Sequence, residues 1–394
     1  MATGTKKESG AKESAGSGGK IDARDLLTEE ELGLKEMTEI PKRIEEIERA
    51  LEEKMALNVS FDVVFREMVF GSKRTAFLYI NGFAKDAIMT EVIERLTYLE
   101  RDQIVPDTVN SLLKKFVVHI QVKMIDDFEE AVEAVLKGEM ALFIENERKA
   151  LLIDAKNFPV RSIEEPDLER VVRGSRDGFT ETLLTNVTLV RRRIRDPRLK
   201  LELMKVGRRT QTDVCLAYIS DIADPELVES IRDKINKIDV DGIPLGDKQL
   251  EEWIIGKGWN PYPSVRYSER PDVVSSHLLE GHVVVFSDTS PSVMILPTTF
   301  FHLMEHAEEY RQTPFIGSYL RWIRFFGIFA SLFLLPLWFL FVTNPELKPE
   351  GLEFLGPQEE KKIPLLGQFL IVEIGLDLMR MAAVHTPQPL AVAM

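Results

Sequence analysis

The most uniform hydrophobic pattern in the chain is residues 325–342, eighteen positions without a charged side chain. As a helix rising about 1.5 Å per residue, this stretch would span ~27 Å, close to the ~30 Å hydrocarbon core of a bilayer. It lacks the polar stripe that a surface helix of a soluble domain presents to water. Basic and aromatic residues at its ends fit membrane anchoring: Arg321, Trp322, Arg324 and Trp338. The pattern predicts a transmembrane helix at about residues 323–343.

A second apolar segment, residues 363–384, contains Glu373, Asp377 and Arg380 on one helical face. Three charges cost roughly 9 kcal/mol at the bilayer centre, whereas eleven Leu, Ile, Val and Phe residues return only about 5 kcal/mol. This segment is therefore not expected to insert alone. Either the three side chains line an ion path at a subunit interface, which makes them pore-lining candidates, or the helix lies on the membrane surface.

Upstream, two stretches share one alternation of polar and apolar positions. Residues 75–96 are predicted to form a strand, a turn and a helix, and residues 212–235 repeat that order, pairing Tyr79 with Tyr218. Residues 135–153 and 277–296 match in the same way, and each has a helix that runs into a glycine able to adopt a left-handed conformation. The fold class expected is α/β: two tandem small α/β domains related by internal duplication, each with a mixed sheet, followed by an α-helical transmembrane region.

The hydrophobic pattern also sets the expected domain boundaries. Residues 1–23 are too polar to bury a core, whereas Ile44, Ile47 and Leu51 recur at helical spacing, as in a docking helix. The division expected is a disordered tail at 1–23, an amphipathic helical segment at 24–58, a first α/β domain at 59–165, a linking helix and basic segment at 166–208, a second α/β domain at 209–310 and a membrane region at 311–394.

Charge and cysteine content narrow the function classes. With 64 acidic against 50 basic residues the net charge is −14, which argues against general nucleic-acid binding. The single cysteine, Cys215, excludes an intramolecular disulfide and fits a reducing compartment. More Lys and Arg residues precede the predicted membrane helix than follow it closely, so the bulk of the chain is expected to be cytoplasmic.

Candidate chemistry is sparse. His277, His282, His302 and His306 are close in sequence, but HLMEH is not HExxH, and no metal site or other cofactor is expected. No phosphate-binding glycine motif or catalytic set is found either, so an enzyme is not expected. The basic cluster at residues 191–198 either holds anionic groups or is a solvated helix face paired with acidic residues. Position alone suggests a ligand or interface region in the crevice between the α/β domains: Arg208, Arg209, Glu269 and Arg270.

Several blocks of the chain resemble, in order, one known family. They include RGSRDGFTETLLTN, GRRTQTDVCLAYISDIADPELV, LLEGHVVVFSDTSPSVMILPTTFF and EYRQTPFIGSYLRWIRF, and the similarity covers roughly residues 60–394. The sequence is similar to the A-subunit family of bacterial spore germination receptors. The resemblance implies an inner-membrane protein of the endospore that acts with partner integral-membrane subunits in ion release. It supplies no catalytic residues.

The sequence is compatible with three functions. The first is a membrane subunit of an ion-conducting germination complex, with α/β domains for assembly or sensing. The others are a non-conducting scaffold or germinant-binding A subunit, and an enzyme on a membrane anchor. A homo-oligomer is expected, because one or two helices cannot enclose a pore. The resemblance also implies further membrane helices, so we expect the chain to be truncated after Met394.

Overall fold

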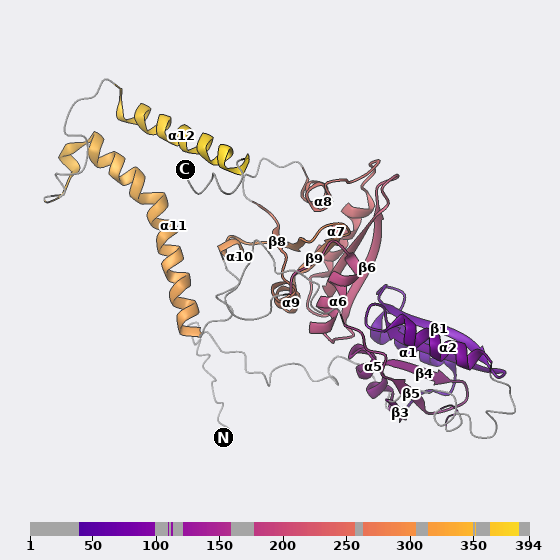
Figure 1. Ribbon diagram of the computed structural model, residues 1–394. Coiled ribbons are helices and arrows are strands. Elements are labelled where there is room, and N and C mark those ends of the chain that lie inside the picture. Colours follow the sequence, from indigo (N-terminus) through magenta and orange to yellow (C-terminus); the bar gives the residue numbers. More distant parts are fainter. Residues whose placement is uncertain are drawn as a thin grey trace, which may run out of the picture. The chain divides into compact units, whose positions relative to one another are not determined.

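The computed structural model describes residues 39–98, 109, 112, 121–158, 177–256, 263–304, 314–349, 351 and 363–385. The chain divides into two compact units, Met1–Leu303 and Met304–Met394. The predicted tail at 1–23, the start of the helical segment and the end of the chain lie outside the described residues. Within the first unit the described residues form two α/β domains, drawn in indigo to purple and in magenta to orange in Figure 1.

The first α/β domain is built on a five-stranded antiparallel sheet of order β1-β2-β4-β5-β3. Its strands are β1 (Val63–Phe70), β2 (Lys73–Ile80), β3 (Val122–Ile125), β4 (Met140–Ile144) and β5 (Ala150–Ile153). β1 and β2 are joined by Gly71 and Ser72, whose φ values of 53° and 64° are those of a tight hairpin turn with the right-handed twist of the strands. That turn sets the register of the pair.

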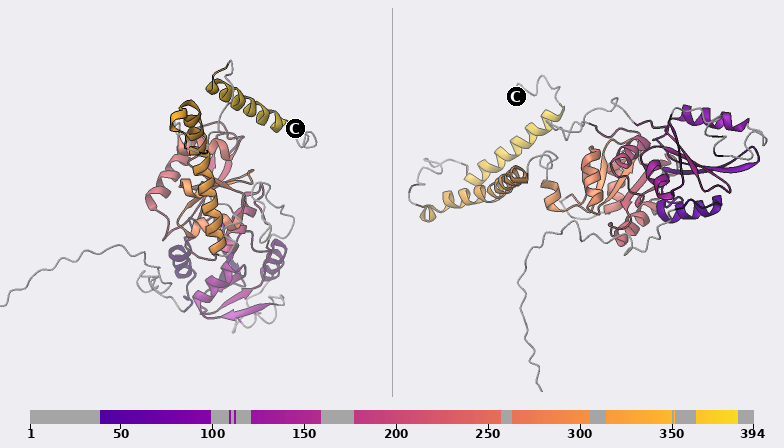
Figure 2. Two further views of the ribbon diagram at one scale, coloured as in Figure 1. Left: turned by 90° about the vertical axis from the view of Figure 1, so that its left-hand side faces the viewer. Right: turned by 90° about the horizontal axis from the view of Figure 1, so that it is seen from below.

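Helices cover both faces of this sheet. α1 (Ile44–Met55) and α5 (Phe128–Leu136) bury one hydrophobic cluster with Ala76 and Leu78 of β2. α2 (Asp86–Thr97) packs a separate cluster on the opposite face (Figure 2). The predicted docking of the amphipathic helix is confirmed, because Ile44, Ile47 and Leu51 are fully buried.

The second α/β domain repeats this three-layer arrangement. Its antiparallel sheet has the order β6-β7-β9-β10-β8, with β6 (Leu199–Val206), β7 (Thr212–Ile219), β8 (Arg266–Ser268), β9 (Val283–Ser287) and β10 (Val293–Leu296). One face carries α6 (Leu183–Arg193) and α9 (Pro271–Leu279), and the other carries α7 (Pro225–Asn236) and α8 (Asp247–Ile255). Cys215 is buried and lies in β7.

The two sheets share strand order and register. Thr75 pairs with Ile144 in the first sheet, and Val214 pairs with Ser287 in the second, at the offsets of 139 and 143 residues that the sequence pattern indicates. Gly138 after α5 and Gly281 after α9 have φ values of 101° and 89°. These positive values confirm the prediction that a glycine ends each of the two helices.

Two details of the predicted architecture are wrong. The sheets are antiparallel rather than mixed, because after α2 the chain crosses to the far edge, where β3 pairs with β5 instead of lying parallel to β2. The boundary predicted between 208 and 209 separates β6 from β7, which pair along eight residues. The basic segment thus supplies α6 and β6 to the second domain and is not a separate linker.

The remaining described residues are mostly helical. After the short α10 (Phe300–Met304) come α11 (Pro314–Thr343), a 3-10 turn at Pro345–Leu347 and α12 (Leu365–His385). Within the described residues, Phe315–Thr343 is the single helix that is long and apolar enough to cross a membrane. It includes the predicted span 323–343 and starts earlier. α12 matches the predicted second helix at 363–384.

Candidate functional site

The two α/β domains are joined by a buried ion pair. Nε of Arg191, on α6, donates to Oδ2 of Asp62 at 2.7 Å, and Nη2 donates to Oδ1 at 3.1 Å. Asp62 directly precedes β1, and both side chains are only 1% exposed. Charges withdrawn from water to this extent are tolerated only where their remaining hydrogen-bonding groups also find partners.

The remaining groups of this pair do find partners. Arg191 Nη1 donates to the carbonyl oxygen of Asp196 at 3.2 Å, and Nη2 donates to that of Leu199 at 3.0 Å. The carbonyl oxygen of Asp62 accepts from the backbone N–H of Asn81 at 2.7 Å. The guanidinium is therefore held by the start of β6 on one side and by the first domain on the other.

The same loop of the first domain covers part of the edge of the second sheet. The backbone N–H of Phe61 donates to the carbonyl oxygen of Leu201 at 3.1 Å, and the N–H of Leu201 donates to Ser60 Oγ at 3.2 Å. β6 is an outer strand, so these bonds satisfy backbone groups that would otherwise be open to another chain. Nearby, the Arg192 guanidinium lies 4.4 Å from the ring centre of Phe158, within cation–π range.

A lysine is buried close to the ion pair. Lys200 on β6 is 8% exposed, and its Nζ donates to the carbonyl oxygen of Pro197 at 3.1 Å. Burial, followed by the positive charge of Arg191, lowers the pKa of Lys200 to about 8, although Asp196 and Asp62 act in the opposite direction. The junction of the two domains thus contains a lysine that titrates far below its ordinary range.

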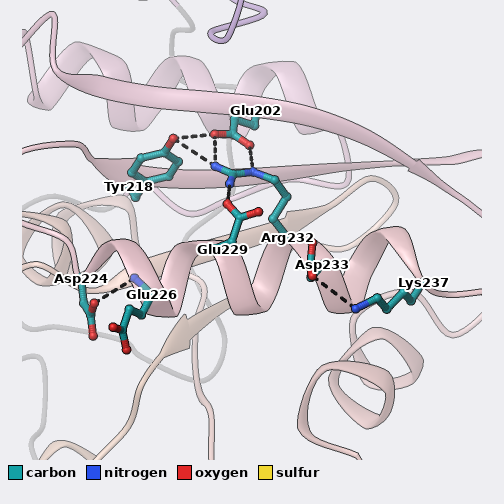
Figure 3. Close-up of polar contacts among 8 residues, drawn as sticks. All are labelled: Glu202, Tyr218, Asp224, Glu226, Glu229, Arg232, Asp233 and Lys237. Atoms are coloured by element: carbon teal, nitrogen blue, oxygen red, sulfur yellow. Dashed lines mark hydrogen bonds and ion pairs between the residues drawn. The ribbon is translucent and has the colours of Figure 1, made fainter.

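A polar network lies two residues further along β6. Arg232 on α7 donates to both carboxylate oxygens of Glu202, each at 2.7 Å, and the Tyr218 hydroxyl donates to the same carboxylate (Figure 3). Arg232 also binds Glu229 one turn away. Burial raises the pKa of Glu202, but the hydrogen bonds from Arg232 and Tyr218 outweigh it, so this pKa lies below its usual range. The network fastens α7 to the sheet.

The sequence pattern did not predict this network. By the shared register, the first domain has Arg66 and Ile93 at the positions that Glu202 and Arg232 occupy in the second. The internal match preserves the core positions and Tyr79 opposite Tyr218, but not the charged partners. The sequence feature that could have indicated the network is that Glu202 and Arg232 differ in kind from the residues at the matching positions of the first domain.

The four predicted ligand or interface residues do not form one cluster. Arg208 pairs with Asp239, and Arg209 lies 3.8 Å from Asp241, both at the end of edge strand β6. Glu269 and the fully buried Arg270 follow β8, the opposite edge of the same sheet. Four strand spacings separate the edges, roughly 19 Å. Arg208 also follows the far end of β6 from Leu201, where the domains meet.

The three pore-lining candidates all fall on α12. Glu373, Asp377 and Arg380 are exposed, and Arg380 Nη1 lies 3.4 Å from Asp377 Oδ1. Of the basic cluster, Arg193 binds Asp177, and Arg198 binds Asp196 and Asp221, so both pair with acidic residues as one interpretation predicts. The cluster is not a solvated helix face throughout, because Arg191 is buried and Arg198 follows the end of α6. Among the described residues no group of three or more His, Cys, Asp or Glu side chains is arranged to hold a metal ion. His306 lies outside the described residues.

Comparison with known proteins assigns the chain to one family. The family described as "Bacillus/Clostridium GerA spore germination protein" matches residues 49–394. Stage V sporulation protein AF of Bacillus subtilis is 44% identical over 347 residues, covering 88% of this chain and 70% of that protein. The uncharacterized membrane protein YfkQ of the same organism is 34% identical, covering 83% of this chain and 64% of that protein.

One solved structure shares the fold of the two α/β domains. The N-terminal domain of the A subunit of the Bacillus megaterium spore germinant receptor GerK3 is 26% identical with a TM-score of 0.50, covering 68% of this chain and 98% of that domain. The fold of the two domains and the family match together place the chain among spore germination proteins. The chain belongs to the GerA family, which confirms the resemblance found in the sequence. It spans about two thirds of the length of the curated relatives it matches.

Proposed function

We propose that the chain is a non-enzymatic membrane subunit of a spore germination complex that contributes to ion release across the inner spore membrane. The observation that carries this proposal is α12, an apolar helix with Glu373, Asp377 and Arg380 on one face, which follows a helix long enough to span a bilayer. Ionisable residues in a membrane segment are rare and mark ion paths more often than structural positions.

The pairing within α12 supports a place beside water rather than lipid. Asp377 and Arg380 are within 3.4 Å, which offsets part of the cost of bringing either charge into the membrane. Glu373 remains one turn away on the same face. A helix of this kind inserts favourably where its charged face meets water or a second charged helix, so the proposal includes homo-oligomerisation and partner integral-membrane subunits.

The α/β domains supply assembly or sensing surfaces in this proposal, on the cytoplasmic side of the membrane. Their shared strand order and register support descent from an internal duplication. The buried Asp62–Arg191 pair lets a ligand or partner that shifts one domain also act on the other, because separating the pair would leave uncompensated buried charges.

Ion flux from liposomes tests the conducting role. We expect liposomes that contain the chain, reconstituted with and without partner membrane subunits, to release entrapped ions. Glu373→Gln with Asp377→Asn should reduce the rate at least roughly tenfold. Glu346→Gln, in the 3-10 turn outside α12, is the matched control and should conduct normally. Unchanged flux in the double variant would exclude α12 as the lining of the path.

A germinant-binding A subunit or non-conducting scaffold is the alternative. It is favoured by the similarity of the α/β domains to the N-terminal domain of a germinant receptor A subunit. In that case liposomes containing the chain remain tight with every partner combination. Binding of small germinants to the α/β domains, detected as NMR line broadening, would then distinguish a receptor from a scaffold.

A further inference from the structure

Three histidines of the second α/β domain contact one another. The ring centre of His277 lies 5.1 Å from that of His282 and 5.6 Å from that of His302, and the ring centres of His282 and His302 are 4.9 Å apart. All three pairs have edge-to-face geometry. His277 belongs to α9, His282 to the turn before β9 and His302 to α10. These three residues, called the histidine cluster, are used neither by the domain junction nor by α12.

The cluster attaches α10 to the domain. Of the α10 side chains that the structure describes, Phe300, Phe301 and Leu303 are exposed by 54%, 61% and 39%, and only His302 turns inward. Its Nδ1 is buried without a hydrogen-bond partner. The ring contacts of His302 with His277 and His282 therefore fasten α10 to the domain.

The geometry at His277 requires a neutral imidazole. Its Nδ1 lies 2.9 Å from the carbonyl oxygen of Val273, so this nitrogen carries the hydrogen. Its Nε2 then accepts from Nη1 of Arg266 on β8 at 3.2 Å. A proton on Nε2 would place a second N–H against the guanidinium, so protonation and the Arg266 bond are mutually exclusive.

The other two rings extend this constraint. His282 Nδ1 lies 3.1 Å from the carbonyl oxygen of His277 and donates to it, which leaves Nε2 as the site of protonation. Within the part of the chain that the structure describes, the charged and titratable groups that act on these rings are Arg266 from β8, Glu280 from the end of α9 and the three imidazoles themselves. When the rings are protonated, this group would contain one carboxylate, one guanidinium and as many as three imidazolium charges.

The pKa values of His277 and His282 are both lowered, which also favours the neutral rings. Burial lowers the pKa of His277, and Arg266 and His282 lower it further, whereas the hydrogen bond to Val273 opposes this. Burial and the charge of His302 also lower the pKa of His282. Separation of α10 would take the His302 ring away from both other rings, which reduces their burial and removes the charge of His302 from His282. In the docked state these rings therefore bind protons less readily than in a state where α10 has separated and their pKa values lie closer to 6.5.

We propose that the histidine cluster is a pH-sensitive attachment that keeps α10 docked on the second α/β domain while neutral and releases it when protonated. Because the docked pKa values are the lower ones, docking is fully stable above about pH 6.5 and weakens as the pH falls below that value. Nine residues, 305–313, connect α10 to α11. Release of residues 297–304 would lengthen this connection by about 26 Å, at roughly 3.3 Å per extended residue.

Hydrogen exchange of the full chain in detergent or vesicles tests the proposal. In the docked helix the N–H of Leu303 is bonded to the carbonyl oxygen of Thr299. After correction for the intrinsic pH dependence, exchange in a peptide covering residues 297–304 should rise roughly tenfold or more between pH 7.5 and 5.0. An exchange rate that does not change over this range would overturn the proposal.

Variants separate protonation from packing. His302→Phe keeps an aromatic ring, and His282→Asn can keep the donor to His277, yet neither new side chain titrates. Each should flatten the pH dependence, whereas His385→Phe in α12 should leave it as in the unmodified chain. If His302→Phe already exposes α10 at pH 7.5, His282→Asn decides: a rise as large as in the unmodified chain would refute the proposal.

Discussion

Gly82 of the first α/β domain lies directly against Thr188 of α6 in the second. A β-carbon on Gly82 would lie 2.4 Å from Thr188 Oγ1, and the glycine has a φ of +88°. The hydroxyl itself donates to the carbonyl oxygen of Leu184 at 2.6 Å, one turn back along α6. Three α6 side chains, Thr188, Arg191 and Arg192, thus meet turns or ends of the first domain.

Gly82→Ala should therefore loosen the junction. The positive φ strains alanine by about 1 kcal/mol, and the contact with Thr188 adds to this. Gly256→Ala is the matched control, since that glycine has a φ of +81° but open space around it. We expect the loss of unfolding free energy to be about 1 kcal/mol greater at Gly82. Adding Thr188→Ala should recover most of that difference, and no recovery would refute the contact.

Breaking the buried ion pair should be costly. Asp62→Ala leaves Arg191 charged, buried and without its carboxylate, which should lower the unfolding free energy by about 3–5 kcal/mol. The double change Asp62→Leu and Arg191→Met should cost much less, because no unpaired charge remains. Denaturant titration of both variants checks this. Equal losses would mean that packing, not charge, joins the domains.

Lys200→Met should stabilise the protein at neutral pH. The pKa of Lys200 is lowered from 10.5 to about 8, so at pH 7 the folded chain holds a charge that burial disfavours. Between pH 8 and 10.5 the unfolded chain binds the extra proton, so the unfolding free energy of the unmodified chain rises with pH. The variant should gain about 1–3 kcal/mol at pH 7 and lose this part of the slope. Thermal unfolding at pH 7 and 9.5 measures both.

Glu202 should contribute a stability term of opposite pH sense. Its folded-state pKa is below the ordinary 4.5, so the ionised form stabilises the fold. That contribution is complete above about pH 4.5 and is lost as the pH falls through the lower folded-state value. Glu202→Gln should therefore lower the unfolding free energy at pH 7. In this variant the unfolding free energy should also fall less steeply on the acid side of the pH profile, its acid limb. Parallel acid limbs in the two proteins would contradict the network in Figure 3.

Local sequence pattern was enough to locate the secondary-structure elements of this protein. Hydrophobic periodicity depends on local geometry, so it located α1, the matched strand–helix stretches, the capping Gly138 and Gly281, and the apolar helix α11. Separate blocks of sequence were also specific enough to indicate the family. All of these are properties of contiguous residues.

Contacts between residues far apart in the chain became known only from the folded structure. Asp62 and Arg191 are 129 positions apart, and nothing in their spacing indicates that the carboxylate of one binds the guanidinium of the other. Strand order made the sheets antiparallel and placed Arg208 and Arg270 at opposite edges. Packing likewise brought three histidines into contact without the spacing of a metal motif. Long-range pairing depends on chain topology, which local pattern constrains but does not fix.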